Sequence, residues 1–340
     1  MNEPRTGRAL ILATKPFEKE RLLRSWFELL STYVAYAICL AVVLWSSSLM
    51  LRIAASLLAG CVQFRLFSHF HEHIHGSLLG RSRPARWLMS ATGVFILTPR
   101  AVWKETHDFH HRNNGKLEWT TIGSYPVMTV EQLAEASSQE RHRYHRSRHP
   151  LRILAGYVTV GIGGMCLAAF RRSPKRHWVG PVAVVIHVLM LAVLWWTLGL
   201  LTMVLVLLVP IIVNHMMASY LFFAQHNFPG TRFFARGSWS YTDAALHGSS
   251  HLVMGPVMRW LTSNIGYHHV HHLNAKIPGY RLPEAMAAIE ELQSPHRTSF
   301  APSDMLACLR TWVWDSEQQR MLTRDEARQQ PEPVAEPASQ

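Results

Sequence analysis

The sequence contains few cysteines, and those that it has are isolated from one another. Cys39, Cys61, Cys166 and Cys308 form no CxxC pair. Thiolate-bound zinc and iron–sulfur clusters need grouped cysteines, so neither kind of site has a basis here. Isolated cysteines in apolar stretches usually pack as small hydrophobic side chains, and nothing in their arrangement requires an oxidising compartment.

Charge is also scarce. Asp, Glu, Lys and Arg make up 16% of the 340 residues, against roughly 25% in soluble domains. The region 178–231 contains none of them, while the AVILMFWYC set reaches 49% overall. This composition excludes general disorder and argues against a purely soluble globule. Histidine, in contrast, is abundant, with 21 residues against 22 Asp plus Glu.

The uncharged runs predict four membrane spans in two helical hairpins. The run 29–51 is long enough for one span, and a weaker candidate, 53–70, is interrupted by Arg65, which we expect to reach towards the interface. The region 178–231 accommodates spans at 181–198 and 200–224, with a turn near Gly199. The run 153–170 is also long enough, but its four glycines weaken a helix.

Basic residues indicate how these spans are oriented. Residues 76–180 contain 16 Lys plus Arg and residues 1–28 contain six, whereas the hairpin turns have almost none. By the positive-inside rule, both termini and the middle segment face the cytoplasm. Topology thus accounts for the net charge of +12, and without a recognisable reader module we do not expect nucleic-acid binding.

The first histidine cluster spans His69 to His75. Residues four apart share a helix face, so His71 and His75 could bind one metal ion, while His69 and His73 offer a competing register. Two HxxHH patterns follow, and in each the three imidazoles share one helix face. They comprise His107, His110 and His111, and His268, His271 and His272.

An isolated histidine on an apolar face is usually a hydrogen-bonded structural residue, and we interpret six of the others in this way. They are His177, His187, His215, His247, His251 and His296. The grouped histidines between 142 and 149 lie among arginines and are typical of a basic solvated surface. If the three boxes build one metal centre, they must lie on one side of the membrane. We therefore predict that 153–170 does not cross.

These boxes, in this order, resemble the membrane fatty acid desaturase family, a histidine-box non-haem diiron group, and most of all its bacterial acyl-lipid desaturases. The resemblance covers roughly residues 15–315. Its matching stretches are HEHIHG at 71–76, WKETHDFHHRNNG at 103–115, FFAQHNFPG at 222–230, ALHGSSH at 245–251 and RWLTSNIGYHHVHHLNAKIPGYRLPEA at 259–285.

The resemblance implies the ligand set. It selects His71 and His75 in the first box, adds His226 as a ninth ligand, and suggests Asn264 as a water-mediated ligand. His73 and His269 stand where the family usually has other residues. Carboxylates that could orient the ligand imidazoles are Glu72, Asp108 and Asp243; tryptophans beside the boxes, which line the substrate groove or are interfacial aromatics, are Trp103, Trp119 and Trp260.

The resemblance also implies the fold and the chemistry. The expected fold is an all-α integral membrane protein with two transmembrane hairpins and a helical cytoplasmic cap that carries the metal centre. Two iron ions would use O2 to insert a double bond into a membrane lipid acyl chain that enters from the bilayer. The chain has neither a haem-binding HPGG nor a cysteine cluster, so electrons would come from an external ferredoxin or cytochrome b5-like carrier, which the basic face could dock. The expected location is the bacterial inner membrane.

The expected organisation divides the chain into six parts. They are a cytoplasmic segment 1–28, the first hairpin 29–70, a cytoplasmic or interfacial segment 71–180, the second hairpin 181–224, a cytoplasmic cap 225–323 and a disordered tail 324–340.

Other functions compete with desaturation. The stretch from His71 to His75 is also HExxH, in which Glu72 would be the general base of a zinc metalloprotease, but that motif leaves both HxxHH boxes unexplained. A histidine-rich metal carrier would favour exposed flexible tracts. A diiron hydroxylase or ketolase acting on another lipid would share all three boxes.

Overall fold

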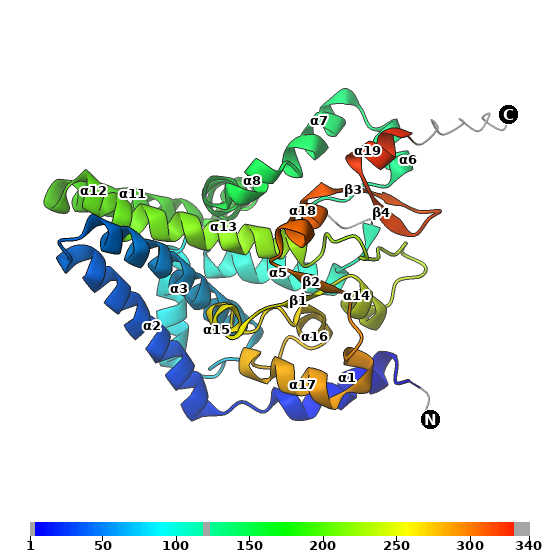
Figure 1. The fold of residues 1–340 in the computed structure, drawn as a ribbon, viewed down its shortest axis with the longest axis horizontal. Helices are drawn as coiled ribbons and strands as arrows, with labels where there is room; N and C mark the ends of the chain where they lie inside the picture. Colours follow the sequence, from blue (N-terminus) through cyan, green and yellow to red (C-terminus); the bar gives the residue numbers. More distant parts are fainter. Residues whose placement is uncertain (1–3, 118–122, 330–340) are drawn as a thin grey trace.

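The computed structural model describes residues 4–117 and 123–329. Within them, four helices are long and apolar enough to cross a membrane, and they pair into two hairpins (Figure 1). This confirms the all-α fold with four spans. The four are α2 (Leu22–Trp45), α3 (Leu49–His75), α11 (Val179–Leu198) and the helix Leu200–Ala224, which comprises α12 (Leu200–Met203), η4 (Val204–Leu208) and α13 (Val209–Ala224).

Both hairpin turns lie at the same end of the molecule, on the left of Figure 1. The second turn is at Gly199, as predicted, where φ is +80°. The first turn falls inside the uncharged run 29–51, which is therefore not one span. The chain reverses at residues 46–48 because α2 ends at Trp45 and the Ser48 hydroxyl then accepts from the amide of Leu51, at the start of α3.

Helix α3 is the central span and packs against both α2 and α13. A small residue permits its close approach to α13: a Cβ atom at Gly60 would lie 2.5 Å from Cβ of Val213. Such small-residue crossings are a common way for membrane helices to pack. At the turn end, Arg52 of α3 donates to Val43 O and to the Thr202 hydroxyl, and so links the two hairpins.

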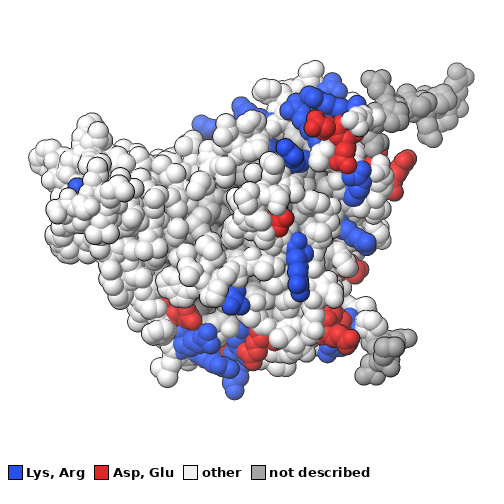
Figure 2. All heavy atoms as spheres, in the orientation of Figure 1, with Lys and Arg blue, Asp and Glu red and all other residues white. Residues whose placement is uncertain are grey.

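The outward faces of the spans are apolar although they are exposed. Large exposed side chains include Ile38 on α2 and Trp196 on α11, at 58% and 88% exposure. Figure 2 shows that the surface over the spans is nearly free of charged side chains, which gather at the opposite end. An apolar outer surface of this extent is typical of a membrane-embedded helix.

The glycine-rich run 153–170 forms α8 (Pro150–Leu154), the π-helical segment η3 (Tyr157–Ala168) and the start of α9 (Ala169–Arg172). Its glycines permit close packing. A Cβ atom at Gly156 would lie 2.0 Å from the Ser219 hydroxyl oxygen, and one at Gly161 would lie 2.7 Å from the His215 ring, both on α13. The segment lies against the second hairpin and is not among the four candidate spans.

The remaining described elements are short and lie mostly at the end opposite the hairpin turns (Figure 1). Two small sheets, one parallel (β1–β2) and one antiparallel (β3–β4), accompany the helices. The elements are α1 (Gly7–Thr14), η1 (Lys15–Glu18), α4 (Arg83–Phe95), α5 (Arg100–Asn113), α6 (Val130–Glu135), α7 (Ser138–Ser147), α10 (Pro174–His177), α14 (Tyr241–His247), β1 (His251–Val253), α15 (Pro256–Leu261), α16 (His268–Leu273), η5 (Gly279–Arg281), α17 (Leu282–Ala288), η6 (Glu290–Leu292), β2 (Arg297–Ser299), α18 (Pro302–Arg310), β3 (Thr311–Asp315), β4 (Arg320–Thr323) and α19 (Arg324–Gln329).

The predicted disordered tail, 324–340, starts too early. Its first six residues form α19, which packs against the β3–β4 hairpin. The helix is capped reciprocally: the Thr323 amide donates to the Glu326 carboxylate, and the Glu326 amide donates to the Thr323 hydroxyl. This is a capping box, and Thr-x-x-Glu is visible in the sequence. Residues 330–340 lie outside the described part.

The topology prediction can be tested by cysteine labelling. If η3 does not cross the membrane, Gln139→Cys before it and Lys175→Cys after it react with a membrane-impermeant maleimide from the same side. Ser47→Cys, in the first hairpin turn, reacts from the other side. All three positions are exposed, and the parent chain controls for its own cysteines. Labelling of Gln139→Cys and Lys175→Cys from opposite sides would refute the prediction.

Candidate metal centre

Four segments bring the nine predicted histidines together. His71 and His75 lie one turn apart at the end of α3, which stops at Gly76 in the left-handed conformation. His226 lies just beyond α13. The HxxHH residues occupy one face of α5 and one face of α16, since i, i+3 and i+4 positions coincide on a helix; they are His107, His110 and His111, and His268, His271 and His272.

The nine imidazoles form two groups, within each of which the candidate ligand atoms lie within 4.8 Å of one another. Helix α3 contributes only to the first group, and the segment after α13 contributes only to the second. Helices α5 and α16 contribute to both groups. The first group consists of His71, His75, His107, His111 and His271, and the second of His110, His226, His268 and His272.

The histidines point their Nε2 atoms at one another. Eight Nε2–Nε2 pairs are 2.7 to 3.2 Å apart. Mutual hydrogen bonds cannot account for them, because a neutral Nε2 either donates one proton or accepts with one lone pair. Metal–nitrogen bonds are about 2.0–2.1 Å, so two nitrogens at right angles on one ion lie about 3 Å apart. The spacing therefore fits nitrogen donors that share metal ions.

The charge state of these side chains also suits metal binding. Burial lowers the pKa of His268, His271 and His272 well below the usual value, and neighbouring imidazoles lower it further. Burial likewise lowers the pKa of His226, to about 4, although a hydrogen bond to the Gly248 carbonyl opposes this shift. The imidazoles are therefore neutral near pH 7, with lone pairs free for a metal ion.

Two residues that the sequence did not single out orient ligand imidazoles. Nδ1 of His110 lies 2.7 Å from the Ser124 hydroxyl, and Nδ1 of His226 lies 2.9 Å from the Gly248 carbonyl oxygen. Each contact leaves Nε2 facing the centre, as is common for metal-bound histidines. Both partners lie in connecting segments, where no local spacing relates them to the histidine that they contact.

The competing histidines lie outside both groups and have structural partners. Nε2 of His69 is 3.3 Å from the Thr32 hydroxyl, and Nδ1 of His73 is 3.0 Å from Leu78 O. Nε2 of His269 is 3.1 Å from the Leu292 carbonyl oxygen. The register through His69 and His73 is therefore wrong for a shared site.

The three carboxylates expected to orient the ligands have other partners. Glu72 accepts from the amide of Gly279 at 2.8 Å, and Asp108 forms an exposed ion pair with Lys104. Asp243 accepts from the Ser240 hydroxyl at the start of α14. No hydrogen bond joins any of the three to a ligand imidazole within residues 4–117 and 123–329. The expectation was wrong because helix spacing does not show which neighbouring segment a carboxylate faces.

Of the other predicted residues, Asn264 and the three tryptophans, one tryptophan lies against a ligand histidine. Asn264 has φ of +57° and donates from its side-chain amide to Gly279 O at 3.1 Å, so its role as a water-mediated ligand stays a prediction. Trp103 stacks on His107 with ring centroids 4.7 Å apart. Trp260 is 42% exposed and stacks with Arg65 instead. Trp119 lies outside the described residues.

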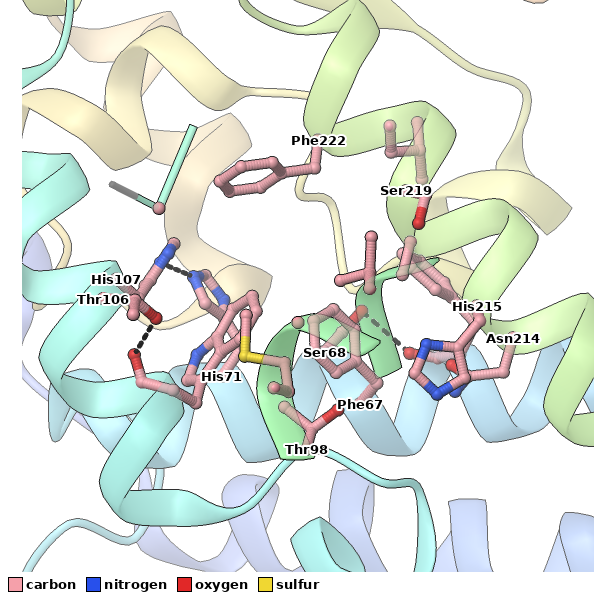
Figure 3. A pocket seen from close by; sticks show the side chains of 18 of the residues that line it. Phe67, Ser68, His71, Thr98, Thr106, His107, Asn214, His215, Ser219 and Phe222 are labelled. Carbon is pink, nitrogen blue, oxygen red and sulfur yellow. Dashed lines mark hydrogen bonds between the residues drawn. The ribbon is translucent and has the colours of Figure 1, made fainter. Parts of the chain in front are cut away.

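A cavity of about 260 Å³ extends from the metal centre between α3, α13 and η3. Figure 3 shows His71 and His107 at one end of it, and Asn214 and His215 at the other. Aromatic side chains line the part next to the histidines; they are Phe67, Trp103 and Phe222. The cavity is mostly apolar and reaches the ligand set, which suits a hydrocarbon chain.

Comparisons with known proteins agree on one family. Residues 47–303 match the family model described as fatty acid desaturase. The chain is 29% identical over 308 residues to a fatty acid desaturase of Bacillus subtilis, covering 89% of this chain and 87% of that protein. It is 23% identical to the sn-1 oleoyl-lipid 12-desaturase of a Picosynechococcus species, covering 79% and 77%. It is 24% identical to the sn-1 acyl-lipid omega-3 desaturase (ferredoxin) of a Synechocystis species, covering 69% and 66%.

Ligand substitution tests the two groups separately. We expect His75→Asn, in the first group, and His226→Asn, in the second, each to lose about half or more of the bound metal, because each removes one nitrogen donor. His73→Asn, two residues from His75 but outside both groups, should keep it. The measurement is metal content per chain by mass spectrometry of the purified protein. Loss of metal from His73→Asn together with full retention in His75→Asn would contradict the assignment.

The Ser124 contact can be tested without activity. Ser124→Ala removes the partner of His110 Nδ1, and we expect metal affinity to fall about tenfold or more, the size typical of such outer contacts. Competition with a chelator of known affinity measures this change. Ser124→Thr keeps the hydroxyl and should bind the metal as the parent does. Equal affinity in Ser124→Ala and the parent would show that the contact has no role in metal binding.

Proposed function

The chain belongs to the fatty acid desaturase family, and from this premise we propose that it introduces a double bond into an acyl chain of a membrane lipid at a diiron centre. The observation that carries the proposal is the arrangement of nine histidines in two groups beside a mostly apolar cavity. The family consists of oxidoreductases. The substrate, the metal and the oxidant are the parts proposed here.

The donor set fits iron. All nine donors are imidazole nitrogens, and groups of five and four donors leave coordination positions open for oxygen. The two iron ions, when bound, supply the means to reduce O2 and to remove hydrogen from an unactivated carbon. The overall reaction balances: two hydrogens of a CH2–CH2 unit, one O2, two electrons and two protons give a CH=CH unit and two water molecules.

The protein itself positions the substrate and excludes water. The cavity walls confine an extended acyl chain, and Trp103 and Phe222 flank the histidines at its inner end. Fixing the reacting methylene groups beside the metal centre removes translational and rotational freedom before reaction. The apolar walls also keep water from the reacting carbons.

Electrons come from an external carrier in this proposal. The described and undescribed parts of the chain together contain four dispersed cysteines and no HPGG. One relative carries ferredoxin in its name, and we propose a ferredoxin or a cytochrome b5-like protein as the donor here. We also propose that the protein is a multi-pass protein of the bacterial inner membrane whose metal centre and termini face the cytoplasm, since the basic residues gather there.

A related hydroxylase or ketolase remains the second candidate, because it would use the same histidines on another lipid. The HExxH protease is disfavoured by geometry as well as by family. Glu72, its would-be general base, is bound to the Gly279 amide, and a single zinc site would leave the second histidine group without a role.

Expression in a host that lacks polyunsaturated lipids tests the function. We expect a new double bond in the host's fatty acids, detected by mass spectrometry, and its loss by at least about 10²-fold in His110→Ala, since that change removes a metal ligand. A hydroxylated product alone would favour the second candidate. Unchanged lipids, with iron and an electron donor supplied, would count against both.

A further inference from the structure

A basic hollow of about 850 Å³ lies beside the apolar cavity. The sequence suggests only a solvated surface here, but the structure folds α7, α8, α18 and the start of α19 around an open concavity. Figure 2 shows basic side chains, with acidic ones among them, over this corner of the molecule. Four exposed arginines line the hollow: Arg146, Arg152, Arg310 and Arg324.

These four guanidinium groups are not neutralised by the protein. No ion pair joins any of them to a carboxylate within residues 4–117 and 123–329. Among the residues that the structure describes, Asp325 is the one acidic residue that lines the hollow. A fifth arginine, Arg148, is buried and donates to Pro126 O, the Asn227 side chain and Thr311 O, which makes the floor rigid. Arg324 lies over the Trp312 ring, with its Cζ atom 5.6 Å from the ring centroid. The hollow thus presents four guanidinium groups without a carboxylate partner, beside the buried and hydrogen-bonded Arg148.

The hollow adjoins both an exposed apolar edge and the metal cavity. Leu151 and Val158, on the same edge, are 72% and 59% exposed, as expected for side chains that face lipid. Thr159 of η3 lines the hollow and the cavity alike. A molecule with an anionic group in the hollow could therefore pass an apolar chain by Thr159 towards the histidines.

We propose that this hollow binds the phosphodiester head group of a membrane phospholipid whose acyl chain occupies the cavity. Guanidinium groups pair with phosphate oxygens through forked hydrogen bonds, and a phospholipid joins such a phosphate to an acyl chain. The inference rests on the proposed function and specifies its substrate: an acyl chain esterified in an anionic phospholipid, in preference to one in an uncharged glycolipid. Arg146 and Arg152, which come from the segments next to the bilayer edge, are the principal contacts.

The test compares two lipids that carry identical acyl chains. Vesicles contain phosphatidylglycerol and monogalactosyl diacylglycerol together, with the full-length iron-loaded protein and an excess of reduced carrier. The doubly substituted Arg146→Gln/Arg152→Gln protein should desaturate phosphatidylglycerol about tenfold more slowly, because charge-assisted hydrogen bonds are lost. Its rate on the galactolipid should change less than about twofold. Arg143→Gln, on α7 but outside the hollow, is the matched control and should behave as the parent.

A second measurement does not depend on activity. Native mass spectrometry of the iron-free protein should show phosphatidylglycerol retained by the parent and by Arg143→Gln, and lost from the double variant. Retention without any double bond in either lipid would leave this site supported and the proposed function contradicted. Equal slowing on both lipids, with phosphatidylglycerol still retained, would overturn the site.

The same experiments distinguish two other possible occupants of the hollow, an acidic electron carrier and an acyl-coenzyme A. If the arginines dock an acidic electron carrier, the double variant would need more carrier for half-maximal rate, whichever lipid is present. If they bind the phosphates of an acyl-coenzyme A, that substrate and not phosphatidylglycerol would show the tenfold dependence on Arg146 and Arg152. Either result would overturn the phospholipid assignment.

Discussion

The structure depends on one constraint: nine Nε2 atoms from four separate segments must meet within a few ångströms. Two segments lie at or just beyond the ends of membrane helices, α5 lies between the hairpins and α16 lies in the cap. Neither the spans nor the cap can therefore form the centre alone. The requirement that all nine lie on one side explains why the spans are arranged as two complete hairpins. Burial keeps the imidazoles neutral, and the same burial removes water that would compete for their lone pairs.

Buried polar contacts fix the position of the cap relative to the spans, so that the histidines of both parts can meet. Arg65 of α3 pairs with Glu28 of α2 and donates to Thr32 and to the carbonyl oxygen of Trp260 in the cap. Six residues before His71 on α3, this group therefore joins three segments. A buried ion pair of this kind contributes little net stability, since desolvating the charges offsets their attraction. The ion pair instead fixes geometry, because the Arg65 guanidinium reaches Glu28, Thr32 and Trp260 together only when the three segments lie in these positions.

The sequence predicted those features that arise from regular spacing. Uncharged runs located the spans, and i, i+3 and i+4 spacing identified the six HxxHH histidines, because both depend only on neighbouring residues. In the first box, spacing left two registers open, and the family resemblance selected His71 and His75. His226 lies alone and needed the family resemblance. The first turn was misplaced because three serines are compatible with a span as well as with a cap. Ser124 and Gly248 could not be found, since their contacts depend on the path of loops between distant elements.

The glycines of segment η3 weaken it as a helix but permit the close packing that shapes the cavity. Its glycines lower helix propensity, and the sequence alone therefore suggests a poor span. In the fold, Gly156 and Gly161 let the segment approach α13 so closely that any side chain would collide with it. That approach places Thr159 and Val160 along the cavity while Val158 faces outward. A helix with ordinary side chains would lie farther from α13 and would change the width of the cavity that opens onto the histidines. The glycines therefore act on the site through packing distance, which no property of the segment in isolation reveals.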